Sequence, residues 1–593
     1  MTSLAAHPWS IIAPGMHPRA DPPRAWTSGW TSGSTRDESA GERRRFAGLV
    51  AAAFLLLTVP RLLLHELWRD EAWLWLVVTE SRSLAELLAP LSRSGQGYLF
   101  PLLCFLARQV STSPRALQLV HLALAGAAAF VFARWAPFGR RERALFVLGH
   151  FPFYEYAVIS RHYAAGALLV WLACCATRSS RPALALGTAL GLLCQTTVYG
   201  YILALAIAAG WLLDRRLRRG EVAPLARGDA AAGLALALAG AVAGLVQLVP
   251  RPGTSFAPGW RFGWDPALAS SVLSTPWRAF VPLPRPELHF WNTNLLDAWP
   301  GLEAMLGALT LALAAALLWR RKAALATFGL GAAGLLAFGY VKLVGALRHQ
   351  GHFWLLFAAA LWLAGGLGSE DGRRSWRARA LLILLLVHGG AGAYASWMDL
   401  RHPFSNGAAT AELIRREGLD RYPLLGYREP PAATVALALG RPLYFPSRRV
   451  FATYPDWGPE QRELGDRELR CAARELARRE GEDIVLVVNR ELPPWGELAA
   501  AGARLGAIVG TEDYHLYRLR QGLLNPTAPA AQCALPGPTI SAPPHPSTTV
   551  DEERGEPGAD GTRTGPADRR GRPAGAVPAA QLHSPARARP ARR

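Results

Sequence analysis

The chain has 593 residues, of which 51% are apolar or aromatic and 18% are charged; 64 Lys and Arg against 44 Asp and Glu leave a formal charge of +20. This low charged fraction excludes a wholly disordered chain. Basicity alone would suggest nucleic-acid binding, but the long charge-free Leu/Ala runs argue against it. Basic loops, apolar runs and 21 Trp are instead typical of a multi-span membrane protein.

The two ends of the chain show no hydrophobic period. Residues 1–45 are rich in Pro, Ser, Gly, Trp and Arg, and residues 521–593 in Pro, Ala, Gly and Arg. Both segments are predicted to be disordered. The first apolar run begins near residue 46, too deep in the chain for a cleavable signal peptide.

Apolar runs between these ends predict a transmembrane domain over residues 46–398. A crossing needs about 20 residues, or somewhat fewer where the bilayer thins, and several runs are short, so the count of about 11 spans is open by one or two. The runs fall near 46–64, 115–135, 144–159, 162–177, 183–198, 200–213, 230–250, 302–319, 323–341, 352–368 and 379–397.

The basic clusters predict the orientation of these spans. They all fall on one side, provided that the Pro-containing run at 97–110 is interfacial or re-entrant and does not cross. The N-terminus is then cytoplasmic, and the region after residue 398 lies outside. The clusters are Arg43-Arg44-Arg45, Arg140-Arg141-Arg143, Arg178/Arg181, Arg215-Arg216-Arg218-Arg219, Arg320-Arg321-Lys322 and Arg373-Arg374-Arg377.

Residues 399–520 return to ordinary globular composition and predict a small extracytoplasmic α/β domain. Helices are expected over 409–416 and 468–479, and strands over 483–489 and 514–519. This domain shows neither a Gly-rich phosphate loop nor a catalytic triad, which favours a cap or recognition role. Cys471 and Cys533 lie outside the apolar runs, and a disulfide between them is left open.

The outside loops carry the residues that suit chemistry. In His65-Glu66-Leu67-Trp68-Arg69-Asp70-Glu71, after the first span, one carboxylate of the Asp-Glu pair can act as a general base while the other orients it or holds a cation. The structural alternative is a helix N-terminus, where acids suit the dipole.

Three further groups lie on the same side. Glu155 sits inside an apolar run six residues before Arg161, which suits an anionic phosphate or a structural pair with Glu155. Lys342 and Arg348 could bind phosphate, whereas the nearby His349 and His352 lack a third ligand for zinc. The Trp-rich loop over 251–301 suits a sugar ring or an interfacial Trp belt.

Trp68-Arg69-Asp70-Glu71-Ala72-Trp73 resembles the acidic first outside loop of the GT-C superfamily of polytopic glycosyltransferases, in the branch of protein O-mannosyltransferases and aminoarabinose transferases. Together with Tyr154-Glu155-Tyr156-Ala157-Val158-Ile159-Ser160-Arg161 and Arg348-His349-Gln350-Gly351, it is similar to a group of bacterial membrane proteins with RDEA, YEYxVIxR and RHxG motifs. The resemblance covers about residues 46–520.

The resemblance implies an inverting transfer of a sugar from a polyprenyl-phosphate donor to an acceptor outside the bacterial cytoplasmic membrane. Asp70 takes the position of the catalytic base and Glu71 that of its partner. Phosphate contacts are expected from Arg69, Arg161, Lys342 and Arg348, with support from Glu155, Tyr156, His162 and His349. The sequence identifies no cofactor, and a divalent cation at the Asp-Glu pair is left open.

One departure from the group concerns Gly95-Gln96-Gly97, where relatives tend to have Gly-His-Pro. If that His serves catalysis, this chain has lost or replaced it. Two alternatives to a glycosyltransferase therefore stay open, namely a transporter or flippase of a lipid-linked substrate and a non-catalytic envelope assembly protein. A transporter would place polar residues near the middle of several spans.

Overall fold

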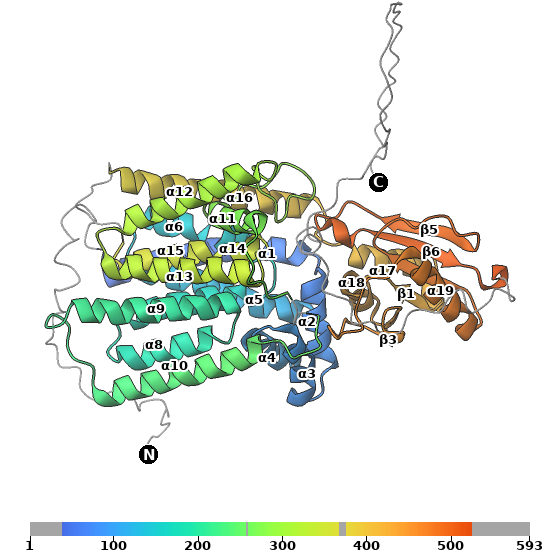
Figure 1. Ribbon diagram of the computed structural model, residues 1–593, viewed down its shortest axis with the longest axis horizontal. Helices are drawn as coiled ribbons and strands as arrows, with labels where there is room; N and C mark the ends of the chain where they lie inside the picture. The colour runs from blue at the N-terminus through green and yellow to red at the C-terminus, as the bar shows by residue number, and fades with distance from the viewer. Residues whose placement is uncertain (1–37, 256–258, 367–374, 525–593) are drawn as a thin grey trace, which may run out of the picture. The chain divides into compact units, whose positions relative to one another are not determined.

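The computed structural model describes residues 38–255, 259–366 and 375–524. The predictions for 1–37 and for the tail after 524 lie outside these residues. Residues 40–401 form a bundle of helices (Figure 1). By length and composition, seven of the described helices could cross a membrane: α1 (Ala40–Leu64), α5 (Arg115–Trp135), α9 (Val198–Leu217), α10 (Arg227–Leu248), α12 (Pro300–Leu318), α13 (Lys322–Val341) and α16 (Trp376–Arg401).

Shorter elements occupy the four remaining apolar runs. Three runs contain single helices, α7 (Tyr163–Ala176), α8 (Pro182–Leu193) and α15 (His352–Leu363). The run at 144–159 is divided between α6 (Arg140–Val147) and η2 (Phe151–Glu155), a π-helix in which the Tyr156 amide donates to the Phe151 carbonyl at 2.8 Å. Pro152 has no amide hydrogen to continue α6, so this apolar run does not form one uninterrupted helix.

The first span begins earlier than predicted. The Ser39 hydroxyl accepts from the Glu42 amide at 3.2 Å, and the Glu42 carboxylate accepts from the Ser39 amide at 2.8 Å. This reciprocal cap starts α1 at Ala40 rather than at residue 46. The charged turn at Arg43–Arg45 is therefore part of the helix.

The loop over 251–301 contains a helix that we did not predict. The Asp265 carboxylate caps α11 (Pro266–Phe280) by accepting from the amides of Ala267 and Leu268. Phe280 at its end is fully buried, with its ring 5.3 Å from that of Trp354 on α15. The loop therefore enters the helix bundle instead of lying wholly outside it.

Three short helices, α2 (Arg69–Glu80), α3 (Leu84–Ser94) and α4 (Leu99–Arg108), connect the first span to α5. At 1.5 Å per residue, the ten residues of α4 are too few to cross a bilayer, in line with the expectation for 97–110. Gly95 ends α3 in the left-handed conformation, with φ +63°. A Cβ at Gly97 would lie 2.1 Å from the Gln195 carbonyl oxygen, so the chain passes too closely here for any side chain.

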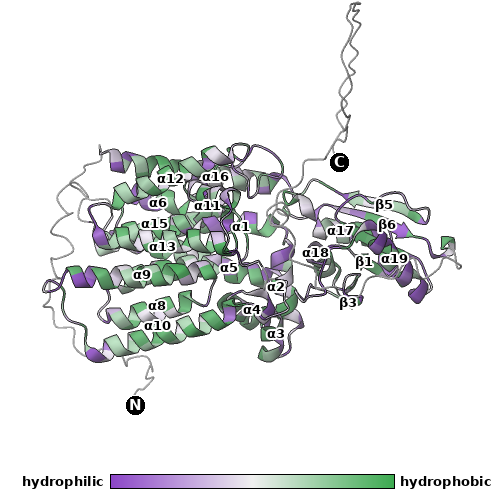
Figure 2. Ribbon diagram, viewed as in Figure 1, coloured by the Kyte–Doolittle hydropathy of each residue, from purple (hydrophilic) through white to green (hydrophobic). Residues whose placement is uncertain are grey.

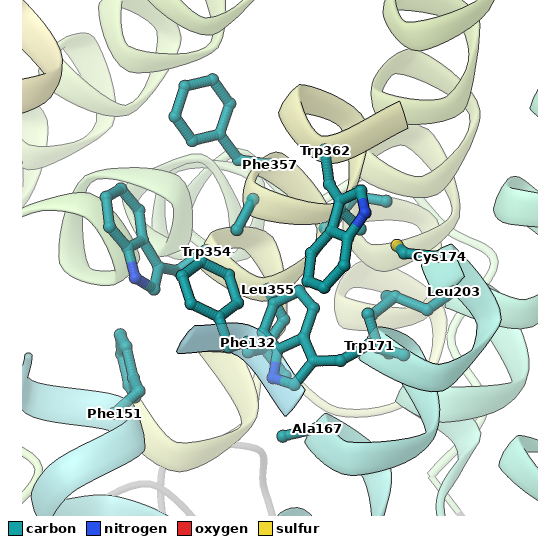
Figure 3. Close-up of a cluster of buried hydrophobic side chains, with 14 of the residues drawn as sticks. Phe132, Phe151, Ala167, Trp171, Cys174, Leu203, Trp354, Leu355, Phe357 and Trp362 are labelled. Atoms are coloured by element: carbon teal, nitrogen blue, oxygen red, sulfur yellow. The ribbon is translucent and has the colours of Figure 1, made fainter. Parts of the chain in front are cut away.

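Aromatic side chains form the centre of the bundle (Figure 3). The rings of Trp171 on α7 and Trp362 on α15 stack at 5.9 Å, and Phe132 on α5 meets both edge-on at 5.0 and 5.6 Å. All three are nearly inaccessible. Hydrophobic residues dominate the helices of the bundle (Figure 2), as burial in the bundle and contact with lipid require.

Charges divide between the two ends of the bundle. Near the start of α1 and α6, Glu38 pairs with Arg43, Arg140 and Arg143, and Arg181 pairs with Asp229 at the start of α10. Asp70, Arg161 and Asp399 lie at helix ends that alternate with these along the chain. The charged groups at the two ends of the bundle are thus held by different partners, and the predicted orientation stays a prediction.

Residues 402–524 form an α/β domain around one sheet, in the strand order β3-β2-β1-β4-β6-β5. Strands β1, β2 and β4 run parallel, whereas β3, β6 and β5 are antiparallel to their neighbours. The strands are β1 (Leu424–Gly426), β2 (Leu443–Phe445), β3 (Val450–Ala452), β4 (Ile484–Val488), β5 (Leu498–Arg504) and β6 (Tyr514–Leu519).

Helices cover both faces of this sheet. One core joins α17 (Gly407–Arg416) and α18 (Glu429–Leu439) to Val485 and Val487 of β4. The other joins α19 (Asp466–Glu480) to Leu486 of β4. The alternation of β4 side chains between two apolar layers explains its uninterrupted hydrophobic sequence. Cys471 is buried on α19, and Cys533, its possible partner, lies beyond the described residues.

Candidate functional site

The first turn of α2 presents the Asp-Glu pair in two different environments. An Asp70 carboxylate oxygen lies 3.2 Å from Nη1 of Arg161, which stands between η2 and α7. The Arg161 side chain is 6% exposed and the Asp70 side chain 23% exposed. Asp70 is therefore more accessible from outside than the Arg161 guanidinium that balances its charge.

Glu71 is fully buried and is held by three groups. Its Oε2 accepts from the Trp68 amide at 3.2 Å and lies 3.3 Å from Nε2 of His65, and its Oε1 accepts from the Ser160 amide in a short hydrogen bond. The Trp68 contact is the helix-start role that the sequence left as an alternative. Glu71 also joins the segment bearing Asp70 to the segment bearing Arg161.

A second buried cation, Arg348, acts on His162 and Tyr163, as Arg161 does. The Arg348 guanidinium stands over the rings of Trp68 and Trp291, 5.1 and 5.2 Å from their centroids. The Trp291 indole donates to both carboxylate oxygens of Glu155 at 3.2 Å. Arg161 thus forms an ion pair with Asp70. Glu155 accepts from Trp291, one of the two indole rings that lie under the Arg348 guanidinium.

The supporting residues predicted from the motifs surround Arg348. Tyr156 donates its hydroxyl hydrogen to the Arg348 carbonyl at 2.7 Å. His162 and His349 lie against the ring of Tyr163, at 4.8 and 5.9 Å. Burial, with Arg348 beside it, lowers the pKa of His349 well below 6.5. The neutral ring accepts from the Ala346 amide through Nδ1 at 2.9 Å.

Two predicted phosphate contacts lie against other residues. Lys342 stands over the ring of Trp260, in the loop before α11, with its Nζ 5.1 Å from the ring centroid. Arg69 points toward the α/β domain, where its guanidinium lies 3.4 Å from the Thr511 hydroxyl. Trp260 and Trp264 are 55% and 79% exposed while Trp291 is buried, so the Trp-rich loop combines surface and interior residues.

The α/β domain forms hydrogen bonds with the segment that carries Asp70. Glu512 accepts from the Arg69 amide at 2.9 Å, and Glu66 accepts from the Phe404 amide at 2.8 Å. Burial raises the pKa of Glu512 to about 7, although Arg69 acts in the opposite direction. Farther along α2, the Trp73 indole donates to the carbonyl of Pro455 in the α/β domain at 3.0 Å.

Sequence reasoning did not single out Asp399 or Glu512 for this site, and it named Trp291 only as one of the aromatic residues of the loop over 251–301. Asp399 stands near the end of α16 and contacts His65 at 3.2 Å. Its place as an acid at the outside end of the last span was a usable signal. Glu512 lies in a soluble segment rich in acids, where composition offers no such signal.

The described residues contain no group of three or more His, Cys, Asp or Glu side chains arranged to hold a metal ion. His349 and His352 instead stack on Tyr199, with ring centroids 5.1 and 4.9 Å from it.

Comparisons with known proteins gave two structural likenesses. The fold is similar to the crystal structure of ArnT from Cupriavidus metallidurans in the apo state, with a TM-score of 0.44 and 13% identity over 81% of this chain and 98% of that chain. It is also similar to that protein bound to undecaprenyl phosphate, with a TM-score of 0.43 and 13% identity over 79% and 97%. No family model and no curated protein match the sequence.

Proposed function

We propose that this chain is an integral membrane glycosyltransferase that moves a sugar from a polyprenyl-phosphate donor to an acceptor on the extracytoplasmic side, with Asp70 as general base. The observation that carries the proposal is the pairing of a partly exposed Asp70 with a buried Arg161 at 3.2 Å. The proposed setting is a bacterial cytoplasmic membrane, with the N-terminus in the cytoplasm and the α/β domain outside.

Hydrogen-bond donors around this pair support an anionic ligand. Among the described residues, Arg161 Nε, Trp68 Nε1 and Asn292 Nδ2 are buried without a hydrogen-bond partner, as is the Ser160 hydroxyl. Buried donors ordinarily have partners. Asn292 accepts from the amide of Leu347, next to Arg348, so its amide group lies near the second cation. Phosphate oxygens would satisfy donors of this kind.

The geometry suggests an order of events. A donor phosphate approaching Arg161 competes with Asp70 for the guanidinium and so frees the carboxylate. Asp70 then takes the proton of an acceptor hydroxyl or amine while the acceptor atom attacks the anomeric carbon. The bond from that carbon to the phosphate oxygen breaks, and the lipid phosphate leaves with the electron pair. Arg161 and Arg348 stabilise its added charge.

Glu71 serves this reaction without touching the substrate. Because it is fully buried and accepts from two backbone amides, it fixes the separation of Asp70 from Arg161. The single direct displacement that we propose inverts the anomeric centre.

The test compares envelope glycans and glycoproteins by mass spectrometry in cells lacking the gene and complemented with variants. Wild type restores a missing hexose or pentose. Asp70→Asn lowers transfer by roughly 10²–10⁴-fold, because it removes the base, while its membrane level stays normal. The matched control is Asp420→Asn, an exposed acid of the α/β domain, which restores the sugar fully.

Two outcomes would overturn the assignment. Full restoration by Asp70→Asn would exclude Asp70 as the base. A glycan profile that does not depend on the gene, together with movement of a lipid-linked substrate across vesicles containing the protein, would favour the transporter alternative.

A further inference from the structure

His65 lies between two buried carboxylates at the boundary of the first span. Its Nδ1 is 3.2 Å and 3.3 Å from the two carboxylate oxygens of Asp399, and its Nε2 is 3.3 Å from Oε2 of Glu71. The His65 and Glu71 side chains are inaccessible, and that of Asp399 is 1% exposed. Both ring nitrogens face acceptors, and only an imidazolium carries a proton on each.

The charges favour that form. Burial opposes a charged ring, but the carboxylates of Asp399 and Glu71 outweigh it and raise the pKa of His65 well above 6.5. Two carboxylates and one cation leave one net negative charge in this chain of contacts. An isolated buried carboxylate would be costly, so the His65 proton stabilises both acids.

Both apolar and polar groups surround His65. The Phe404 ring lies against the imidazole with the ring centroids 4.5 Å apart, and Gln118 of α5 donates to the His65 carbonyl oxygen. Other titratable or charged groups act on His65 or its two acids from the neighbouring elements, namely Glu66, Arg61 of α1, His121 of α5 and Tyr154 of η2.

The three residues join parts of the chain that are far apart in sequence. His65 follows α1, the first span, and Asp399 lies near the end of α16, the last. Glu71 carries the connection onward to the Ser160 amide, beside Arg161. A shift of Glu71 would therefore move Asp70 and Arg161 relative to each other.

We propose that His65 and Asp399 are positioning residues, which hold the Glu71 carboxylate in place and so keep Asp70 and Arg161 in register for an anionic donor. This inference rests on the proposed glycosyltransferase function only for its catalytic consequence. The imidazolium and its two partners are tested independently of activity.

The first test is nuclear magnetic resonance of ¹⁵N-histidine-labelled full-length protein in lipid nanodiscs. Wild type shows one doubly protonated imidazolium at pH 8, assigned by its loss in His65→Gln. Asp399→Asn moves the deprotonation of this signal to lower pH. A neutral His65 ring at pH 6.5 in the wild type would overturn the proposal, whatever the enzyme activity.

The second test follows the pH profile of sugar transfer. Asp399→Asn lowers kcat about tenfold or more and moves the alkaline limb to lower pH, with a smaller change in the KM for the donor. Asp297→Asn is the matched control, since Asp297 is a buried acid paired with Arg278 at a different place; it leaves the alkaline limb unmoved. An unshifted limb in Asp399→Asn would contradict the positioning role.

The two tests separate this inference from the proposed function. An imidazolium signal without any sugar transfer by the wild type would refute the proposed function and leave the contacts of His65 with Asp399 and Glu71 intact. Transfer that depends on Asp70 but not on Asp399 would refute the positioning role and leave the proposed function intact.

Discussion

The acidic side chains of this site differ in how deeply they are buried and in which groups they contact. Asp70 is partly exposed and paired with a cation, Glu71 is buried among donors, and Glu512 is buried with one oxygen on the Arg69 amide. Only the first arrangement suits a group that must meet a substrate and then accept a proton. The three carboxylates thus differ in role: Asp70 is the proposed base, Glu71 anchors two segments of the chain, and Glu512 contacts the start of α2 from the α/β domain.

Glu512 makes stability depend on pH in a predictable direction. Burial raises its pKa from 4.5 to about 7, so the folded protein binds more protons than the unfolded chain between these values. The free energy of unfolding therefore falls as pH rises from 4.5 to 7, by roughly 3 kcal/mol from this group, and changes no further above pH 7. Glu512→Gln removes this dependence and is more stable than wild type at pH 7.5, because the amide oxygen still accepts from Arg69.

Thermal unfolding in detergent at pH 5 and pH 7.5 checks this prediction. The control is Glu497→Gln. Burial opposes ionisation of Glu497, but hydrogen bonds from Arg470 and Arg474 outweigh it and lower the pKa to about 2. Its stabilising effect is present above pH 4.5 and is lost only as pH falls toward 2. This variant is therefore equally destabilised at both pH values, and the same behaviour in Glu512→Gln would refute the assigned role.

Among the helices, α8 and α10 meet along a seam of glycines. A Cβ at Gly187 would lie 2.0 Å from the Gly233 carbonyl oxygen, and one at Gly240 would lie 2.3 Å from the Cα of Gly191. Such close backbone approach is how helices associate where lipid provides no hydrophobic drive. The outward side of α10 exposes leucines and valines, which suits contact with lipid tails.

Gly187→Leu is expected to separate this helix pair, because the clash is with backbone that cannot rotate away. The cost is at least about 1–3 kcal/mol, seen as a lower unfolding temperature and a smaller folded yield. Gly389→Leu on α16, where a Cβ meets nothing within 4 Å, is the control and leaves both near wild type. Equal behaviour of the two variants would show that the seam is unimportant.

Secondary structure was predictable where the spacing of apolar residues followed one period along the whole element. The expected strand at 514–519 coincides with β6, and the expected helix at 468–479 lies within α19. Strands β1, β2 and β3 have three residues each, too few to show an alternation. The division between α6 and η2 is set at Pro152 and by packing across the bundle, which hydropathy does not register.

At the scale of the whole molecule, the order of apolar runs predicted the bundle, and the acidic and basic motifs predicted that Asp70 and Arg161 lie at the same end of it. Asp70 and Arg161 are 91 positions apart, yet sidedness placed them together, and the structure pairs them. The links from His65 to Asp399 and from Arg69 to Glu512 could not be predicted, because no pattern relates a span end to a residue 300 or more positions away.

The central claim is base-assisted transfer of a sugar from a lipid phosphate. The most direct measurement is transfer by purified full-length protein in nanodiscs, supplied with a polyprenyl-phosphate sugar and cell-envelope acceptors, with the anomeric configuration of the product read by nuclear magnetic resonance. We expect an inverted product from wild type, and from Asp70→Asn a rate lower by roughly 10²–10⁴-fold with donor binding retained. A retained configuration, or an undiminished rate in Asp70→Asn, would contradict the account.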